Sequence, residues 1–341
     1  MTHRFPIKEI ALQSGLSTAT VDRALNKRRH VSPQTATRVA AAIAELEGQE
    51  AQLAARGRRM FFDVIVEAPT RCSKEVHKAA EQAARNAGPA VCRVRFMAQE
   101  IMTEAQVLAA LARIAKRGSH GVCLKARDTA AIRNAVDRLT KAGIPVVTLA
   151  TDLPTSQRVT YVGLDNQSAG RTAAYLVSTA LAGTSGTVLA LRSNDRFWGE
   201  EEREIAFLQS LSTLCPDLDV IQVSGGSGVH HETSQVLDGV IEQLTNLRAV
   251  YSMGGGNRTI LNILHNNRLS PKMYIAHDLD ADNRDLIAQG QLNFVLHHDL
   301  MADLATVFHA FLHHHKLMPN PPLQTMSNVQ IVTPENIPAK L

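Results

Sequence analysis

The chain has 341 residues, of which 45% are hydrophobic and 20% are charged. This length and composition exclude a disordered polypeptide, a collagen and a disulfide-stabilised mini-protein, and they predict two to three domains. The four cysteines lie far apart without a Cys-x-x-Cys pair, which excludes redox motifs and zinc ribbons of that type. The start of the chain has no signal-peptide pattern, and no apolar run reaches about 18 residues. We therefore expect a soluble cytoplasmic protein that does not enter a membrane.

The positive charge is concentrated at the N-terminus. The formal net charge of the whole chain is +4, but residues 1–59 hold ten Lys and Arg against five Asp and Glu, whereas residues 60–341 hold 26 against 27. This asymmetry favours a nucleic-acid-binding head on a nearly neutral body.

Three short helices are predicted in this head. A helical apolar repeat precedes Gly15, which permits a tight turn. Ser17 is well placed as the N-cap of a second helix, Thr18 to Asn26, and two helices joined in this way form a helix-turn-helix whose second helix can lie in the major groove. Ser32 and Pro33 then open a third helix, because a hydroxyl cap followed by proline is a typical helix start.

The run IKEIALQSGLSTATVDRALNKRRHVSPQTATRVAAAIAEL resembles the N-terminal DNA-binding domain of the LacI/GalR family of bacterial regulators. The matching features are the Gly-Leu-Ser turn, TVDRALN on the second helix and HVSPQT at the start of the third. The resemblance implies two sets of contacts with DNA. Thr18, Ala19 and Arg23 would face base edges, and Ser17, Thr20, Asn26 and Ser32 would hold phosphates.

The chemistry of the second helix agrees with this role. Arg23 can bond guanine O6 and N7 in a bidentate way; the alternative is a surface arginine on an ordinary helical hairpin. Asp22 stands where relatives more usually have Ser, and its carboxylate would either accept from cytosine N4 or repel phosphate. The basic run 27–30 is either a solvated loop or a segment that follows the phosphate backbone.

The segment after the third helix departs from the family. Relatives carry a tyrosine, a Pro-Asn pair and a hinge helix whose leucine wedges into the minor groove, whereas this chain has Gly48, Glu50-Ala51 and Gly57 at those positions. Glycine cannot wedge and weakens a helix by about 1 kcal/mol, so we do not expect the usual minor-groove kink. Instead, three arginines offer electrostatic contacts to DNA: Arg56, Arg58 and Arg59.

From residue 61, buried strands alternate with helices. A strand over FFDVIVEAP is followed by a predicted helix over Ser73–Ala87, and Thr103 and Gln106 form a predicted capping box that opens another helix. Nearly continuous apolar strands between helices indicate parallel sheets covered on both faces. The series occurs twice, which predicts two similar α/β lobes with a ligand cleft between them.

This body resembles the type I periplasmic sugar-binding fold of the same family, on the markers IPVVTLATDLP, YVGLDNQSAGRTAAYL, EEREIAF, AHDLDADNRDLIAQGQLNFVLHHD and IVTPENIP. The resemblance implies a head and linker over 1–59 and a ligand-binding domain over 60–341. The chain would cross between the lobes near Leu164–Asp165, Leu292–Asn293 and Met326. Lobe 1 would then comprise about 61–163 and 293–325, and lobe 2 about 164–292 and 327–341.

Three residues match family positions that contact a sugar: Arg203, four residues before an aromatic, Asp278 after the strand MYIAH, and His298 after the next strand. An arginine supplies a fork of donors and an aspartate supplies two acceptor oxygens, which suits a polyol. Without the resemblance, Arg203 would be read as half of a surface ion pair within a helix.

Other family sugar contacts are replaced. Arg71 and Ser73 stand where relatives carry Asn and an aromatic residue, and Ala150 replaces a ligand aspartate. Lys74 and Lys125 follow strand ends and add positive charge. We therefore hypothesise an anionic effector, a sugar acid or sugar phosphate, paired with Arg71. The alternative is that Arg71 and Lys74 begin a helix and face solvent.

The only tryptophan, Trp198, would either stack on a sugar ring or pack in the core. An enzyme is disfavoured, because the sequence has no Gly-x-Ser-x-Gly, no P-loop and no Gly-x-Gly-x-x-Gly after a strand. His309 and His313 have a spacing that metal ligands can use, but no His-Glu-x-x-His motif is present. We thus predict no catalytic residue, no metal site and no cofactor.

Together these features predict a ligand-responsive transcription regulator, acting as a repressor. Two heads of a homodimer would occupy a pseudo-palindromic operator on double-stranded DNA. A small sugar-like effector in the cleft would control DNA affinity. The alternatives are a sugar-binding activator or co-repressor-type regulator, or a cleft enzyme.

Overall fold

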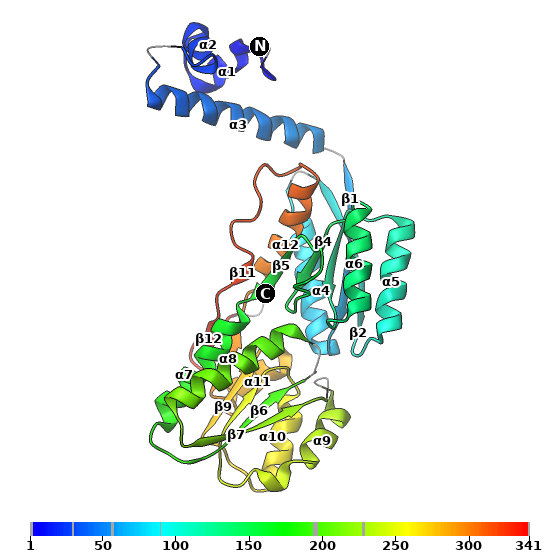
Figure 1. The fold of residues 1–341 in the computed structure, drawn as a ribbon, viewed down its shortest axis with the longest axis vertical. Coiled ribbons are helices and arrows are strands. Elements are labelled where there is room, and N and C mark those ends of the chain that lie inside the picture. The colour runs from blue at the N-terminus through cyan, green and yellow to red at the C-terminus, as the bar shows by residue number, and fades with distance from the viewer. Residues whose placement is uncertain are drawn as a thin grey trace.

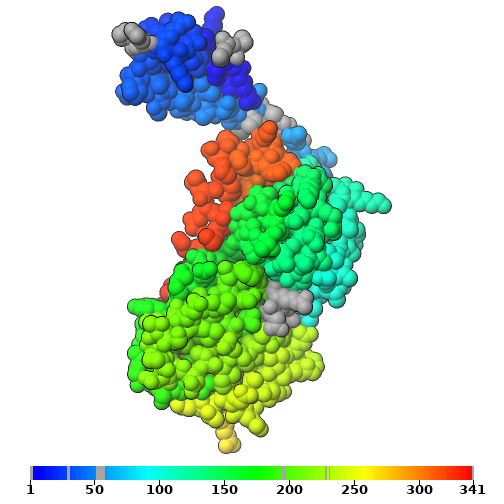
Figure 2. Space-filling view, in the orientation of Figure 1, coloured from blue at the N-terminus to red at the C-terminus, as the bar shows by residue number. Residues whose placement is uncertain are grey.

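The computed structural model describes residues 3–28, 31–55, 58–88, 90–193, 197–226 and 229–339. Three helices form a head at one end of an elongated molecule, and two α/β lobes follow it along the long axis (Figures 1 and 2). The helices of the head are α1 (Ile7–Ser14), α2 (Thr18–Leu25) and α3 (Pro33–Ala55).

The head is held together by a small apolar core in which Ile10 and Val21 are fully buried. The two predicted hydroxyl caps are confirmed: Ser17 accepts a hydrogen bond from the backbone N of Thr20 at 3.2 Å, and Ser32 accepts one from the backbone N of Thr35 at 3.1 Å. Gly15 adopts a φ of 62°, the left-handed conformation that the turn after α1 requires. The head is therefore a helix-turn-helix followed by a long third helix.

Helix α3 continues without interruption through Gly48 to Ala55, so residues 48–55 extend the third helix and do not form a separate hinge helix. The surrounding Ala, Glu, Gln and Leu residues favour helix strongly enough to outweigh the cost of one glycine, about 1 kcal/mol. The predicted loss of the minor-groove wedge rests on Gly57, and one predicted electrostatic contact with DNA rests on Arg56. Both lie outside the described residues. Arg58 and Arg59 are exposed.

Lobe 1 contains a six-stranded parallel sheet in the order β11-β5-β4-β3-β1-β2. Its strands are β1 (Arg59–Glu67), β2 (Val91–Gln99), β3 (Gly121–Lys125), β4 (Val146–Leu149), β5 (Thr160–Leu164) and β11 (Met326–Ser327). Its helices are α4 (Thr70–Asn86), α5 (Glu104–Arg117), α6 (Ala130–Lys141) and α12 (Leu300–His314).

Lobe 2 contains a second six-stranded sheet in the order β12-β10-β9-β8-β6-β7, parallel except for its edge strand β12. Its strands are β6 (Gly186–Arg192), β7 (Leu218–Ser224), β8 (Leu247–Ser252), β9 (Met273–His277), β10 (Phe294–His297) and β12 (Gln330–Val332). Its helices are α7 (Asn166–Leu181), α8 (Trp198–Leu214), α9 (His230–Asp238), the short 3-10 helix over Ile241–Gln243, α10 (Asn257–Asn266) and α11 (Ala281–Ala288).

The sheets are covered by helices on both faces, as the apolar strands predicted. In β1, Val64 packs into the apolar cluster on one face of the sheet, while its neighbour Ile65 packs into the cluster on the other face. The capping box of Thr103 and Gln106 is present at the start of α5. Helix α4 begins at Thr70, earlier than the predicted Ser73, because Pro69 precedes it as its N-cap.

The chain crosses between the lobes three times. The first crossing follows Leu164, as expected. The second does not occur at Leu292–Asn293: the apolar run continues into β10, which pairs with β9 of lobe 2, so the crossing follows His297. The third lies between Ser327 of β11 and Gln330 of β12. Among the described residues, no helix is long and apolar enough to span a membrane.

Candidate functional site

The residues predicted to read DNA lie on and around α2. Thr18, Ala19, Arg23 and Asn26 are exposed, and Thr20 is half-buried. The capping residues Ser17 and Ser32 are also exposed, at the starts of α2 and α3. The buried face of α2 is used by Val21 in the core of the head, so this helix has its opposite face available to a partner.

The carboxylate of Asp22 is paired within the head. It lies 3.3 Å from Nη1 of Arg28 and accepts a hydrogen bond of 2.8 Å from the side-chain amide of Asn26. Arg28 thereby offsets a negative charge that would otherwise face the DNA phosphates. Arg23 lies along the helix, where its Nε donates to the carbonyl of Ala19 at 3.2 Å. Arg29 and His30, the rest of the predicted basic run, lie outside the described residues.

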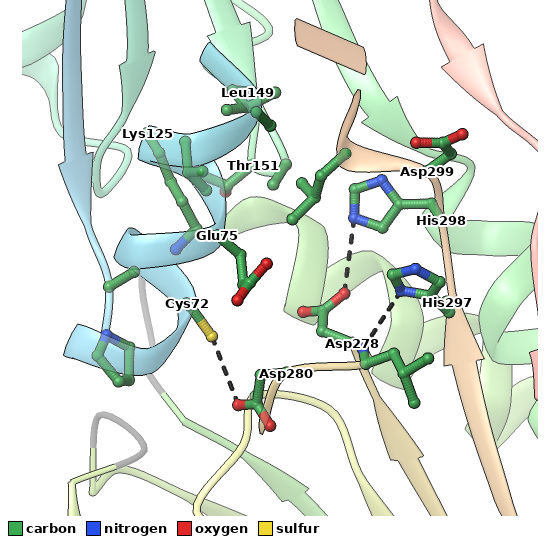
Figure 3. Close-up of a pocket in the computed structure, with 18 of the residues that line it drawn as sticks. Cys72, Glu75, Lys125, Leu149, Thr151, Asp278, Asp280, His297, His298 and Asp299 are labelled. Atoms are coloured by element: carbon green, nitrogen blue, oxygen red, sulfur yellow. Dashed lines mark hydrogen bonds and ion pairs between the residues drawn. The ribbon is translucent and has the colours of Figure 1, made fainter. Parts of the chain in front are cut away.

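The second candidate site is a cavity of about 660 Å³ between the two lobes. In Figure 3, Cys72, Glu75 and Lys125 reach it from lobe 1, and Asp278 and His298 approach from the opposite side. A concave site of this size suits a small molecule. Among the lining residues, Lys125, Asp278 and His298 stand at the carboxyl ends of parallel strands or just beyond them, where α/β folds bind ligands.

Arg203 is buried on the cavity wall with an exposed fraction of 4%. Its Nε donates to Oδ1 of Asn166 at 2.7 Å, and its Nη1 donates to the carbonyl of Met253 at 2.9 Å. The structure therefore places Arg203 in the cleft and not in a surface ion pair. Asn166 begins α7 just after the first crossing, and Met253 follows β8, so the arginine is held by two elements of lobe 2.

Asp278 follows β9 in a left-handed conformation, with a φ of 63°, and lines the cavity. Its Oδ1 is buried 3.5 Å from Nε2 of His298. Burial by itself raises the pKa of Asp278, but His298 and Arg203 outweigh that effect and hold the pKa well below its usual range. The cleft thus contains an ionised acceptor group.

His298 is 2% exposed and lies between two carboxylates. Its Nδ1 donates to Oδ2 of Asp303 at 2.5 Å, and its Nε2 faces Asp278. Burial lowers the pKa of His298, but the two carboxylates raise it further, to about 9. The imidazole is therefore a cation at neutral pH. Its neighbour His297 behaves oppositely, because burial and the charge of His298 lower its pKa to about 4.

Lys125 also lines the cavity. Its Nζ donates to the carbonyl of Glu67 at 2.9 Å and lies 4.1 Å from the centre of the Phe197 ring. Burial lowers the pKa of Lys125, and the carboxylate of Glu200 opposes this. Phe197, not Trp198, is the aromatic residue of the cavity lining. The sequence could have pointed to Phe197 as well, because it is adjacent to Trp198 at the start of α8.

Arg71 makes a bridge between the lobes. Its Nε donates to Oδ2 of Asp280 at 2.6 Å, where the aspartate side chain is 5% exposed and the arginine 23%. Arg71 comes from α4 of lobe 1, and Asp280 caps α11 of lobe 2. The structure thus places Arg71 on a carboxylate of the protein and outside the cavity lining. Lys74 is exposed.

Six further charged residues of the cavity lining were not singled out from the sequence: Glu75, Lys78, Glu200, Asp280, Arg284 and Asp299. The histidines of α12 make backbone contacts instead of a cluster: His309 donates to the carbonyl of Asn320 at 2.8 Å, and His313 lies 3.1 Å from that of Met318. No group of three His, Cys, Asp or Glu suited to a metal ion occurs among the described residues.

Comparison with known proteins identifies both domains of the chain. Residues 6–47 match the family of bacterial regulatory proteins of the lacI type, and residues 69–300 match the periplasmic binding protein domain. The sequence has no significant match among curated proteins.

Solved structures share the fold of the body. GanP, a glucose-galactose binding protein from Geobacillus stearothermophilus, superposes with a TM-score of 0.72 at 16% identity, over 83% of this chain and all of that protein (100%). A solute-binding protein from Burkholderia graminis in complex with D-arabinose has a TM-score of 0.73 at 18% identity, over 83% of this chain and 97% of its own.

A protein assigned as a LacI transcriptional regulator, from Bacteroides fragilis, has a TM-score of 0.72 at 15% identity, over 82% of this chain and 98% of its own. At these identities the structures establish the fold of the body, while the two family matches cover its head and most of its body. The chain therefore belongs to the LacI/GalR family of DNA-binding transcription regulators, with a helix-turn-helix head joined to a periplasmic binding protein domain.

Proposed function

We propose that this regulator is a repressor that binds a pseudo-palindromic operator as a homodimer, and that a small ligand in the interlobe cleft sets its affinity for DNA. The observation that carries the proposal is the combination of an outward-facing α2 with a cleft in which ionised side chains of both lobes meet. Two heads related by a two-fold axis match the symmetry of a palindromic site. Because its target is chromosomal DNA, we place the protein in the cytoplasm.

The ligand is proposed to be sugar-like. Asp278 supplies an ionised acceptor, His298 and Arg203 supply donors, and Phe197 offers an aromatic surface. Sugars combine hydroxyls that need such partners with an apolar ring face that packs on aromatic residues. The arabinose-bound solute-binding protein with the same fold makes neutral monosaccharides a natural part of any ligand panel.

An anionic group on that ligand remains our first proposal. Arg71 and Lys125 are basic residues at the lobe 1 side of the cleft, and a carboxylate or phosphate would compete with Asp280 for Arg71. A neutral sugar is the second candidate, because five carboxylates also line the cavity: Glu75, Glu200, Asp278, Asp280 and Asp299.

Control of DNA affinity follows from the way the lobes are joined. A ligand that touches both lobes stabilises one degree of closure, and it shifts operator binding only by its differential affinity for the two states. Lobe 1 carries the head, since α3 leads into β1. A change in the position of lobe 1 relative to lobe 2 would therefore alter the spacing of the two heads in a dimer.

Selection of bound sequences from random DNA tests the DNA half of the proposal. We expect an inverted repeat whose enrichment changes when the effector is added. Equal binding to all sequences would contradict a sequence-specific regulator, and a single half-site without symmetry would contradict the dimer.

A thermal-shift panel tests the ligand half. It compares neutral monosaccharides with matched sugar acids and sugar phosphates on the full chain. We expect stabilisation by an acidic member. Stabilisation by neutral sugars alone would overturn the anionic effector in favour of the neutral one.

A further inference from the structure

A line of polar side chains leads from the cleft to the segments that connect the lobes. Oδ1 of Asp278 lies 3.5 Å from Nε2 of His298, and Nδ1 of His298 donates to Oδ2 of Asp303 at 2.5 Å. The other oxygen of Asp303 accepts a hydrogen bond from the hydroxyl of Ser327. Both ring nitrogens of the histidine and both oxygens of Asp303 are thus engaged.

These residues bring the three crossing segments together. His298 belongs to the second crossing, between β10 and α12, and Ser327 ends β11 at the third. The backbone carbonyl of Ser327 accepts a hydrogen bond of 3.1 Å from the backbone N of Asp165, at the first crossing. Asp278 and His298 both line the cavity. The line therefore joins the candidate ligand site to the hinge between the lobes.

The charged groups around His298 show which residues stabilise its protonated ring. His298 and Asp303 are each 2% exposed, so an unpaired imidazolium would be strongly disfavoured at this place. The nearby basic groups, His297 and His277, cannot stabilise it: burial keeps both neutral, and its positive charge lowers their pKa further. Arg203 acts on Asp278 from the α8 side. Only the carboxylates of Asp278 and Asp303 favour the charged ring.

We propose that Asp303 is a positioning residue for the effector site: it anchors His298 to α12 of lobe 1 as a cation directed at Asp278 of lobe 2. Asp278 is then kept ionised and in place as an acceptor, and any ligand that binds it also acts on a contact at the hinge. The effector part of this inference rests on the proposed function. The charge and orientation of His298 do not.

NMR titration of ring-labelled histidines in the full chain, without DNA or sugar, tests the inference. A His298→Gln variant identifies the His298 signals. We expect both ring nitrogens of His298 to remain protonated at pH 8, and we expect Asp303→Asn to lower the pKa of His298 by about one unit or more, because one of its two carboxylate partners becomes neutral.

The matched control is Asp299→Asn. Asp299 lies four residues before Asp303 but is exposed, and asparagine retains its capping of α12, so the pKa of His298 should not change. An unchanged pKa in Asp303→Asn would overturn the inference. A neutral His298 at pH 8 in the unaltered protein would also overturn it, and that measurement does not require the variant to fold. Because no ligand is used, failure of the proposed effector would leave this result interpretable.

Discussion

The head and the cleft use charged side chains in opposite ways. In the head, the outward residues of α2 are exposed, come from one short helix and pair with near neighbours in sequence, as Asp22 does with Asn26 and Arg28. In the cleft, Arg203 of α8 is brought together with Asp278 and His298, which follow β9 and β10, and all three are already engaged with protein groups. The head is therefore a preformed surface, whereas the cleft is a network that a ligand must enter and rearrange.

The largest expected effect is loss of the head by a change in its core. Ile10 is fully buried, so Ile10→Ala should cost about 2–5 kcal/mol, which a three-helix domain with so small a core cannot spare. Calorimetry should show an early transition for the head with the transition of the body unchanged, and operator binding should be lost. Leu12→Ala is the control on the same helix, because Leu12 is 85% exposed. Simultaneous loss of the transition of the body would show that the two regions are not independent.

The next effect concerns the bridge between the lobes. Arg71→Gln leaves the buried carboxylate of Asp280 without its cation, and we expect a loss of about 2–3 kcal/mol in stability of the body and a larger radius of gyration in small-angle scattering. Lys74→Gln, an exposed residue on the same helix, should change neither quantity. An unaltered radius and melting temperature in Arg71→Gln would mean that the pair does not hold the lobes together.

A smaller effect is expected for base recognition. Arg23→Ala should cost about 1–3 kcal/mol of discrimination at one base pair of each half-site and relax preference there, with the rest of the site still read. Arg28→Ala should instead weaken binding to all sequences alike and reduce its dependence on salt. Competition binding to single-base variants of the selected operator measures both. If Arg23→Ala keeps the full preference, its assignment to a base is wrong.

The smallest effect is a dependence of stability on pH. The pKa of His298 is raised from 6.5 to about 9 in the folded protein, so its contribution to stability is fully present below pH 6.5 and is lost as the pH rises through 9. We expect the melting temperature to fall by a few degrees over this interval, and to fall less in His298→Gln. Equal slopes in the two proteins would show that His298 is not charged in the native state.

Much of the local structure could be predicted because it depends on near neighbours in sequence. Ser17 and Ser32 each cap a helix by accepting a hydrogen bond from the backbone N three residues later, and the capping box of Thr103 and Gln106 closes within a single turn. The parallel sheets followed from strands that are apolar on both faces. In the site, Arg203, Asp278 and His298 line one cavity, and their contact with a ligand stays a prediction.

Other features could not be predicted, because they depend on contacts between distant segments. The partner of Arg71 is an aspartate of the other lobe, and no local pattern links the two residues. No local pattern distinguishes Phe197, which lines the cavity, from its neighbour Trp198, which does not. The second crossing follows His297 and does not occur at Leu292–Asn293. The pairing of β10 with β9 decides where the strand ends, and the apolar pattern alone does not show this.

Periodicity, capping and charge act over a few residues, so the order of the amino acids was enough to predict the helix-turn-helix, the two-lobed α/β body and the residue types available for DNA and ligand. Which charged side chains are paired with protein groups depends on segments that meet only in the folded chain. Burial and pairing set the ionisation of Asp278 and His298, and these depend on the whole surroundings of each group. The modest excess of positive charge thus separates into an exposed head that faces DNA and a cleft whose charges are balanced across the hinge.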